Sequence, residues 1–277
     1  MSKALLLHID GCRVDTLQAA KTPNIDKLFA AGAWTLNAQT ITPPMTLPVH
    51  FSIFTSLNAM THRVLSNAAR PSVCPSAVGL IEWLKSHGKT TAMYYNWEFL
   101  RELSPPGSLN SSIFLDTMLD KNGDILVAKA ALEDIITIQP DFAFIYLGVL
   151  DEVGHAHGFE SDEYTIALKK ADEAVGYILD TLNKTGTLEE YTIFFESDHG
   201  GIDKDHFHTV PEVMTVPWCV CGPNIQAIEL SSIREVSVMD TIPTIAYIMN
   251  IPLHPNWKGR VVTEAILAVS SEAATRN

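Results

Sequence analysis

The sequence predicts an α/β fold in which a mostly parallel central sheet carries helices on both faces. Two observations support this prediction: apolar runs of strand length alternate with amphipathic stretches of helical length, and acidic residues follow several of these runs. The chain has 277 residues, of which 47% are hydrophobic and 18% charged, so it can bury a large core. We expect a single domain over residues 1–277, allowing for a small insertion near residues 97–122.

The first half of the chain opens with an apolar run at residues 4–9. This run predicts a buried strand that ends at Asp10-Gly11, a pair typical of turns. Thr22 suits a helix N-cap and Pro23 the first helical position, and this helix should stop near Gly32. Apolar residues at helical spacing predict helices over residues 47–57 and 76–87, and residues 90–95 are a strand candidate.

The second half of the chain continues the alternation. Residues 124–138 predict a helix that has to end before Pro140, because proline disfavours helical backbone at the residue before it. The apolar run at residues 142–150 predicts a central strand, and residues 163–182 place apolar side chains on one helix face. Strands over residues 191–196 and 216–221 and a helix over residues 238–249 complete the expected order.

Charge and cysteine usage exclude several classes of protein. Nineteen Lys and Arg against 32 Asp and Glu give a net charge of −13, which argues against binding of a nucleic-acid polymer. The four cysteines, at positions 12, 74, 219 and 221, are too few for a disulfide scaffold and predict buried thiols in a reducing compartment. The apolar runs are shorter than a signal sequence or a membrane span. We expect a cytoplasmic protein without membrane attachment.

Acidic residues and histidines fall where predicted strands end. Asp10 follows the first strand, Asp151 follows the run at residues 142–150, and Asp198 follows the strand at residues 191–196. Ligands of open parallel sheets bind at the carboxyl ends of the strands, so these carboxylates should lie close together. Each residue alone is a common turn or cap residue. Carboxylates this close would raise each other's pKa, and bound divalent cations would remove that cost.

Histidines accompany these acids and narrow the choice of metal. His155, His199 and His206 lie in the same segments as Asp151 and Asp198. Mixed Asp and His ligation suits Zn²⁺ or Mn²⁺ better than Ca²⁺, which favours oxygen ligands alone. The sequence therefore predicts a metal centre at this edge of the sheet.

A nucleophile candidate lies in the segment Pro44-Met45-Thr46-Leu47-Pro48-Val49-His50. Thr46 suits a helix N-cap with Pro48 in the first turn, and the same position would aim its hydroxyl at a metal and at an anion near the helix N-terminus. A threonine hydroxyl is a weak nucleophile, and metal coordination favours its alkoxide form. The cap and the nucleophile interpretations are compatible.

Taken together, these motifs resemble the alkaline phosphatase superfamily and, within it, the nucleotide pyrophosphatase/phosphodiesterase branch. The matching segments are Ile9-Asp10-Gly11, Thr22-Pro23-Asn24, Thr46-Leu47-Pro48-Val49-His50, Asp151 with Gly154-His155, Ser197-Asp198-His199-Gly200-Gly201 and Met214-Thr215-Val216-Pro217-Trp218. The resemblance implies an alkaline phosphatase-like catalytic domain and a small phosphorylated substrate.

The resemblance also implies two divalent metal ions, zinc ahead of manganese. One ion would be held by Asp10, Thr46, Asp198 and His199, and the second by Asp151, His155 and His206. Thr46 would carry a covalent phosphoryl group that water then releases, and Asn67 would donate a hydrogen bond to a phosphoryl oxygen. His208 also lies near the third histidine position, and the spacing to Pro211 favours His206.

Two positions depart from the family pattern, which usually has glycine where this chain has Arg63 and often has it at Phe207. Sulfatases of the superfamily carry Cys or Ser with a following x-Pro-x-Arg, whereas this chain has Thr46 and His50. We therefore expect a two-metal hydrolase of phosphodiester or pyrophosphate bonds. The alternatives are a phosphomonoesterase or phosphonate hydrolase and, outside enzymes, a metal-stabilised binding protein without turnover. Substrate loops are expected at residues 67–74 and 97–112; the sequence leaves the oligomeric state open.

Overall fold

A computed structural model describes residues 2–230 and 235–267 of the chain. Eight strands form one sheet in the order β4-β3-β5-β1-β6-β7-β2-β8. Their bounds are β1 Lys3–Ile9, β2 Gly32–Gln39, β3 Thr91–Tyr95, β4 Ser111–Phe114, β5 Phe142–Leu147, β6 Tyr191–Glu196, β7 Thr215–Cys221 and β8 Ile228–Glu229. β1 pairs in parallel with β5 and β6, whereas β7 runs antiparallel to both β6 and β2. The predicted mostly parallel sheet is confirmed.

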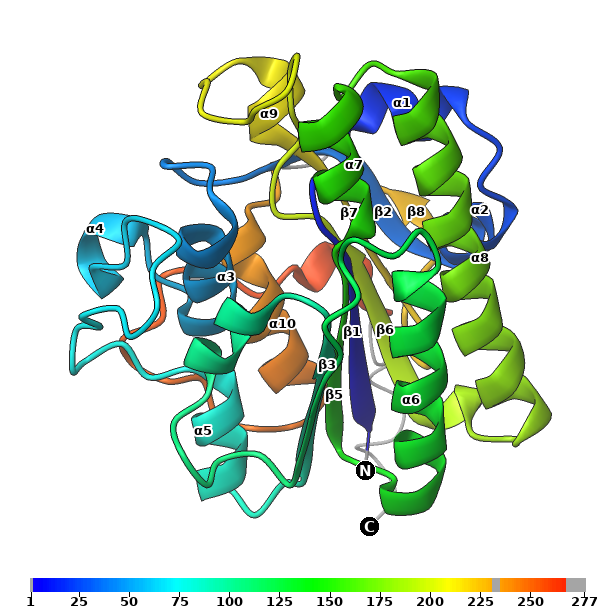
Figure 1. Cartoon of the computed structure of the whole chain (residues 1–277). Helices are drawn as coiled ribbons and strands as arrows, with labels where there is room; N and C mark the ends of the chain where they lie inside the picture. Colours follow the sequence, from blue (N-terminus) through cyan, green and yellow to red (C-terminus); the bar gives the residue numbers. More distant parts are fainter. Residues whose placement is uncertain (1, 231–234, 268–277) are drawn as a thin grey trace, which may run out of the picture.

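Helices cover both faces of the sheet, as predicted (Figure 1). One face packs against α3 (Thr46–Thr55), α5 (Leu80–Ser86) and α10 (Thr241–Ile248), and the other against α2 (Pro23–Ala31), α6 (Gly123–Ile138) and α8 (Asp162–Lys184). The apolar side chains of β1 alternate between these two layers, so that Leu6 joins the first and Leu5 and Leu7 the second. Burial on both sides explains why the central strands are continuous apolar runs.

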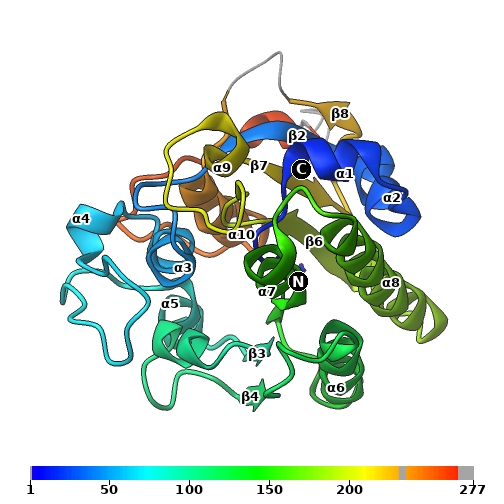
Figure 2. The same cartoon turned by 45° about the horizontal axis from the view of Figure 1, so that its top comes forward.

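The remaining helices lie outside these two groups. They are α1 (Val14–Ala19), α4 (Ala59–His62), α7 (Val149–His157) and α9 (Pro211–Met214), with the 3₁₀ turns η1 (Glu98–Leu103), η2 (Leu188–Glu190), η3 (Val238–Asp240) and η4 (Thr263–Ala265). Figure 2 shows α4 beside α3 and α7 beside α8. Residues 97–122, expected as a small insertion, contain η1 and β4, and β4 forms one edge of the sheet.

One predicted strand is shorter than expected. The apolar run at residues 142–150 ends as a strand at Leu147, and Val149 begins α7, which carries Asp151. The break occurs at Gly148, whose amide donates to Asn96 Oδ1, and a Cβ at this position would meet the Tyr146 ring at 2.7 Å. Val149 and Leu150 are apolar because they form the buried face of the helix, which periodicity alone cannot distinguish from a strand.

Candidate metal centre and nucleophile

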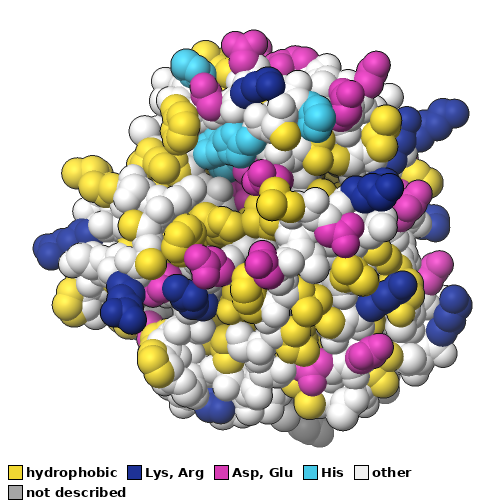
Figure 3. Space-filling view, in the orientation of Figure 1, with side chains coloured by type: hydrophobic (Ala, Val, Ile, Leu, Met, Phe, Trp, Pro, Cys, Tyr) yellow, Lys and Arg dark blue, Asp and Glu magenta, His cyan; other side chains and the backbone are white. Residues whose placement is uncertain are grey.

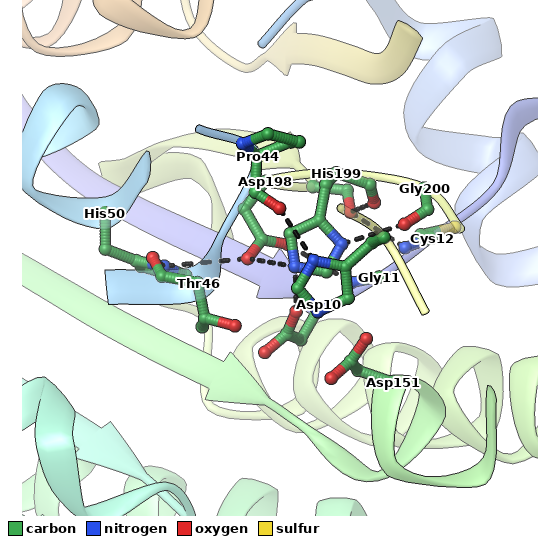
Figure 4. Close-up of polar contacts among 12 residues, drawn as sticks. Asp10, Gly11, Cys12, Pro44, Thr46, His50, Asp151, Asp198, His199 and Gly200 are labelled. Atoms are coloured by element: carbon green, nitrogen blue, oxygen red, sulfur yellow. Dashed lines mark hydrogen bonds and ion pairs between the residues drawn. The ribbon is translucent and has the colours of Figure 1, made fainter. Parts of the chain in front are cut away.

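The predicted site residues come together where β1 and β6 end, beside α7 and the first turn of α3 (Figure 4). Asp10 follows β1, Asp198 follows β6 by two residues, and Asp151 lies in the first turn of α7. Gly11 has a φ of +66°, and a Cβ there would meet Asp151 Oδ1 at 2.6 Å. Glycine is needed here because the backbone after β1 passes directly against Asp151.

The first group of candidate ligands consists of Asp10, Asp198 and His199, all of them buried. His199 Nε2 lies 3.5 Å from Asp10 Oδ1 and 3.3 Å from Asp198 Oδ2, and the candidate ligand atoms all lie within 4.8 Å of one another. Tetrahedral ligation at about 2.1 Å places ligand atoms about 3.4 Å apart, so this spacing suits a zinc-sized ion. Figure 4 shows Thr46 next to this group.

The second group consists of Asp151, His155 and His206. His155 follows Asp151 by one helical turn in α7, which brings its Nε2 to 3.3 Å from Asp151 Oδ2. His206 is 2% exposed, whereas the side chain of His208 is 58% exposed and lies 3.4 Å from Asp205. The geometry therefore favours His206 over His208. Histidine and acidic side chains meet in the upper half of the face drawn in Figure 3.

Backbone carbonyls fix the orientation of all three histidines. Nδ1 donates to Lys204 O at 2.8 Å in His155, to Gly200 O at 2.8 Å in His199 and to Pro44 O at 2.6 Å in His206. A carbonyl only accepts hydrogen bonds, so each Nδ1 carries a proton and, in the neutral form of each ring, Nε2 keeps its lone pair. This arrangement is typical of histidines that bind metal through Nε2.

Several buried atoms of the two groups have no hydrogen-bond partner among the described residues: Asp10 Oδ1, Asp151 Oδ1, Asp198 Oδ2 and His199 Nε2. Leaving such atoms unpaired costs about 1–3 kcal/mol each, and more when they are charged. All four are lone-pair donors with no competing proton of their own. The donor set therefore fits divalent cations, which would pair these atoms and neutralise the carboxylates.

The pKa values reflect the same crowding. Burial, followed by the negative charges of Asp198 and Asp151, raises the pKa of Asp10 well above its usual value. The hydrogen bond to Asp151 raises the pKa of His155 to about 9, whereas burial and the neighbouring His199 lower that of His206 to about 4. The pKa values of Asp151 and Asp198 are lowered instead, because the neighbouring histidines outweigh the effect of burial, so the crowding of the carboxylates is expressed at Asp10.

Thr46 is the first residue of α3, and Met45 takes the N-cap position. The prediction of Thr46 as the N-cap is therefore wrong by one residue, and the Met45 side chain makes no cap hydrogen bond. Asn67 replaces it in this role, because its Oδ1 accepts the Leu47 N–H at 2.9 Å. The Asn67 amide NH₂ remains as a donor beside the helix N-terminus, and the Thr46 hydroxyl is not consumed in capping.

The two departures from the family pattern have different structural roles. Arg63 ends α4 in the left-handed region with a φ of 73°, a conformation that explains why glycine is usual there. Phe207 follows the buried His206 and is itself 62% exposed, so it presents an aromatic ring beside the second group.

The expected substrate loops lie together. Residues 67–74 and 97–112 both line a cavity of about 530 Å³ against α3, with Arg70 and Val73 from the first segment and Arg101 to Pro106 from the second. Trp97 and Phe99 are partly buried and contact each other edge to face, with their ring centroids 5.1 Å apart.

Sequence reasoning missed three polar side chains behind the candidate ligands. His8 and Glu196 are fully buried, and the Tyr146 hydroxyl donates to Asp10 Oδ2. His8 and Glu196 stand near the ends of β1 and β6, two residues before Asp10 and Asp198, which follow these strands. That i, i+2 spacing is the signal that could have found them.

Comparison with known proteins agrees with this geometry. A sequence model of the type I phosphodiesterase / nucleotide pyrophosphatase family matches residues 4–77 and 80–215, which includes every candidate ligand. The chain belongs to this family. The predicted membership of the nucleotide pyrophosphatase/phosphodiesterase branch is thereby confirmed.

Curated relatives of this family are longer proteins. The chain is 27% identical over 217 residues to ectonucleotide pyrophosphatase/phosphodiesterase family member 1 of Rattus norvegicus, covering 71% of this chain and 24% of the relative. It is 26% identical over 229 residues to family member 7 of Mus musculus, covering 72% and 49%. The chain thus spans between a quarter and a half of the length of these relatives.

Solved structures share the fold at low identity. A murine ectonucleotide pyrophosphatase/phosphodiesterase 5, inactive and in complex with AMP, superposes with a TM-score of 0.77 at 13% identity, covering 96% of this chain and 100% of that one. A 2-O GAG sulfatase gives a TM-score of 0.76 at 14% identity, covering 96% and 74%. The predicted alkaline phosphatase-like fold is confirmed. Within the described residues, no helix is both long and apolar enough to span a membrane.

Proposed function

We propose that this protein hydrolyses phosphodiester or pyrophosphate bonds with Thr46 as the nucleophile. The observation that carries the proposal is the placement of Thr46 at the N-terminus of α3, beside two groups of buried Asp and His side chains with unpaired lone pairs. A hydroxyl, two candidate cation sites and a helix N-terminus in one place are the components of in-line phosphoryl transfer.

The residues of the chain have distinct roles in this reaction. Thr46 Oγ1 attacks phosphorus, the bond to the leaving oxygen breaks, and the phosphoryl group stays on Thr46 until water releases it. The Leu47 amide is occupied by Asn67, and Pro48 has none, so the Thr46 amide is the first-turn donor left for a phosphoryl oxygen. The Asn67 NH₂ supplies a second donor. Divalent cations, zinc ahead of manganese, would stabilise the attacking and leaving oxygens when bound.

Two alternatives concern the substrate. A phosphomonoester or a phosphonate could react at the same nucleophile. A phosphomonoester is a dianion, however, and needs more positive charge in the binding site than a phosphodiester, which is a monoanion. Arg70 and Arg101 are the cations of the expected substrate loops, and Arg101 lies 3.4 Å from both Glu98 and Glu102. This supports a diester. A metal-stabilised binding protein without turnover is the third candidate, and the intact Thr46 and ligand groups argue against it.

The cellular location is proposed from the cysteines. All four, Cys12, Cys74, Cys219 and Cys221, are free, and three of them are buried, which supports the cytoplasm as a reducing compartment. A small phosphorylated molecule remains the proposed partner, and the acidic net charge of −13 speaks against a nucleic-acid polymer.

The experiment that tests the function compares bis-p-nitrophenyl phosphate with p-nitrophenyl phosphate, each with Zn²⁺ and with Mn²⁺. We expect a higher kcat/KM for the diester. Faster turnover of the monoester would reject the diesterase proposal in favour of a phosphomonoesterase. Zinc binding without turnover of either ester, or of a phosphonate, would identify the binding protein.

A further inference from the structure

Three buried polar side chains form a row across the central strands beneath the first ligand group. Tyr146 of β5 pairs in register with His8 of β1, and His8 pairs on its other side with Glu196 of β6. Their exposure is zero, and they lie among apolar side chains. Burying polar groups in the centre of a sheet is costly, so a specific role for this polar row is expected.

Tyr146 acts on Asp10. The Tyr146 hydroxyl donates a hydrogen bond to Asp10 Oδ2. The other oxygen, Asp10 Oδ1, has no partner among the described residues and lies 3.5 Å from His199 Nε2. The hydrogen bond therefore leaves one defined oxygen of Asp10 facing the candidate metal position.

His8 lies beside Asp198 in a corresponding position, at close range but without a hydrogen bond. Asp198 Oδ1 accepts the Gly11 N–H at 3.1 Å and lies 3.4 Å from His8 Nε2. Asp198 Oδ2 is unpaired within the described part of the chain and lies 3.3 Å from His199 Nε2. One oxygen of this carboxylate thus accepts the Gly11 N–H and lies near the unpaired His8 Nε2, while the other faces the same point as Asp10 Oδ1.

The two rings support each other. The His8 and Tyr146 rings stack with centroids 5.8 Å apart and an interplanar angle of 12°, and Phe144 packs against both. A cation shared by His8, His50 and Asp198 would explain the row differently, since these residues also cluster. His50 Nδ1, however, donates to Thr46 O at 2.7 Å, so only His50 Nε2, which is unpaired among the described residues, could bind such a cation.

We propose that the stacked pair His8 and Tyr146 selects the ligating oxygen of Asp198 and Asp10, so that both face one metal ion. These are positioning residues, because they act on the ligands and do not themselves reach the metal position. The inference rests on the proposed function only in taking the first group as a metal site. Partners of metal ligands typically contribute 10- to 100-fold to affinity when they orient the ligand.

The test uses isosteric variants of the full-length chain. Tyr146→Phe and His8→Phe keep an aromatic ring in the stack and remove the Tyr146 hydroxyl or the His8 ring nitrogens beside the ligand. Phe144→Leu is the matched control, because it loosens the same packing without removing a polar group. His8→Gln is the rescue variant, since its amide nitrogen can occupy the position of His8 Nε2. Zinc affinity is measured by competition with a chromophoric chelator, alongside the Tm of the metal-free protein.

We expect Tyr146→Phe and His8→Phe each to bind one of two zinc ions about 10- to 100-fold more weakly, with the second ion unchanged. His8→Gln should recover most of the affinity, and Phe144→Leu should lower the metal-free Tm with little change in zinc affinity. Wild-type affinity in both Phe variants would overturn the inference, as would equal losses in the Phe144→Leu control. A wild-type protein that binds zinc but cleaves neither ester would instead reject the proposed function and leave this test intact.

Discussion

Substitutions of Asn67 separate the contribution of a side chain to stability from its contribution to catalysis. Its Oδ1 accepts the Leu47 N–H at 2.9 Å, which leaves its NH₂ group for a phosphoryl oxygen. Asn67→Asp keeps the acceptor and removes the donor, whereas Asn67→Ala removes both. The two variants therefore divide the side chain into its two functions.

The structure sets the expected magnitudes. Loss of one preorganised donor to a developing negative charge lowers kcat by about 10²–10³. Loss of the cap at the start of α3 costs about 1 kcal/mol, which corresponds to about 2 °C in Tm for a chain of this size. Asn67→Asp should thus retain the wild-type Tm. Its kcat should fall by at least about 10²–10³-fold, because the added negative charge also repels the phosphoryl group. Asn67→Ala should lose both.

The assay measures kcat on bis-p-nitrophenyl phosphate at saturating zinc, with Tm from thermal unfolding of the same preparations. Asn58→Ala is a suitable control, because Asn58 caps the neighbouring helix α4 through the Thr61 amide and has no place near Thr46. A kcat within threefold of wild type for Asn67→Ala would refute the role of Asn67. A loss in the Asn58→Ala control equal to that of Asn67→Ala would show that kcat follows local stability instead.

Three further predictions follow from packing, burial and metal linkage. In Gly154→Ala, the added Cβ would lie 2.7 Å from the buried Phe159 ring. We therefore expect the free energy of unfolding, measured in urea, to fall by about 1–3 kcal/mol and zinc to bind more weakly at the second group. An unchanged urea midpoint would contradict this packing argument. Burial raises the pKa of Asp124 from 3.8 to about 6, so the protonated folded form is favoured and stability is lost as the pH rises from about 4 to 6. The Asp124→Asn variant keeps the Oδ1 acceptor for Val149 N–H. Between pH 4 and 7, its free energy of unfolding without metal should therefore rise by up to about 3 kcal/mol relative to wild type. If the stabilities of variant and wild type changed in parallel with pH, this ionisation of Asp124 would be excluded. Zinc at a concentration of about a thousand times its Kd stabilises the folded state by about 4 kcal/mol. Removing zinc with a chelator should therefore lower the Tm by about 7 °C. An unchanged Tm would exclude tight binding of zinc to the folded state.

The sequence predicts the central sheet well because its strands are buried on both faces. β1, β5 and β6 are predominantly apolar, and β1 and β6 lead directly to the acids at the site. The peripheral strand β2 was not predicted, because its side chains alternate in burial and polar residues interrupt the pattern. The antiparallel direction of β7 depends on its pairing with β6 and β2, which no local pattern encodes.

The candidate site was predicted in composition but only partly in geometry. Asp151 reaches it from the first turn of α7 and not from a strand end, because Gly148 breaks an apolar run that fits either structure. His8 and Tyr146 escaped notice because a single polar residue in a buried strand looks like an ordinary core position. Their relation to Asp198 and Asp10 depends on side-chain direction and strand register, which only the folded chain supplies.

The central claim is that Thr46 carries the phosphoryl group, and trapping of that intermediate tests it most directly. The reaction of the zinc-loaded protein with bis-p-nitrophenyl phosphate is quenched with acid, and the peptides are analysed by mass spectrometry. We predict a p-nitrophenyl phosphoryl adduct on Thr46, and we predict that Thr46→Ala loses both adduct and turnover while it still binds zinc. An adduct on another residue, or near-wild-type turnover of Thr46→Ala, would contradict the account.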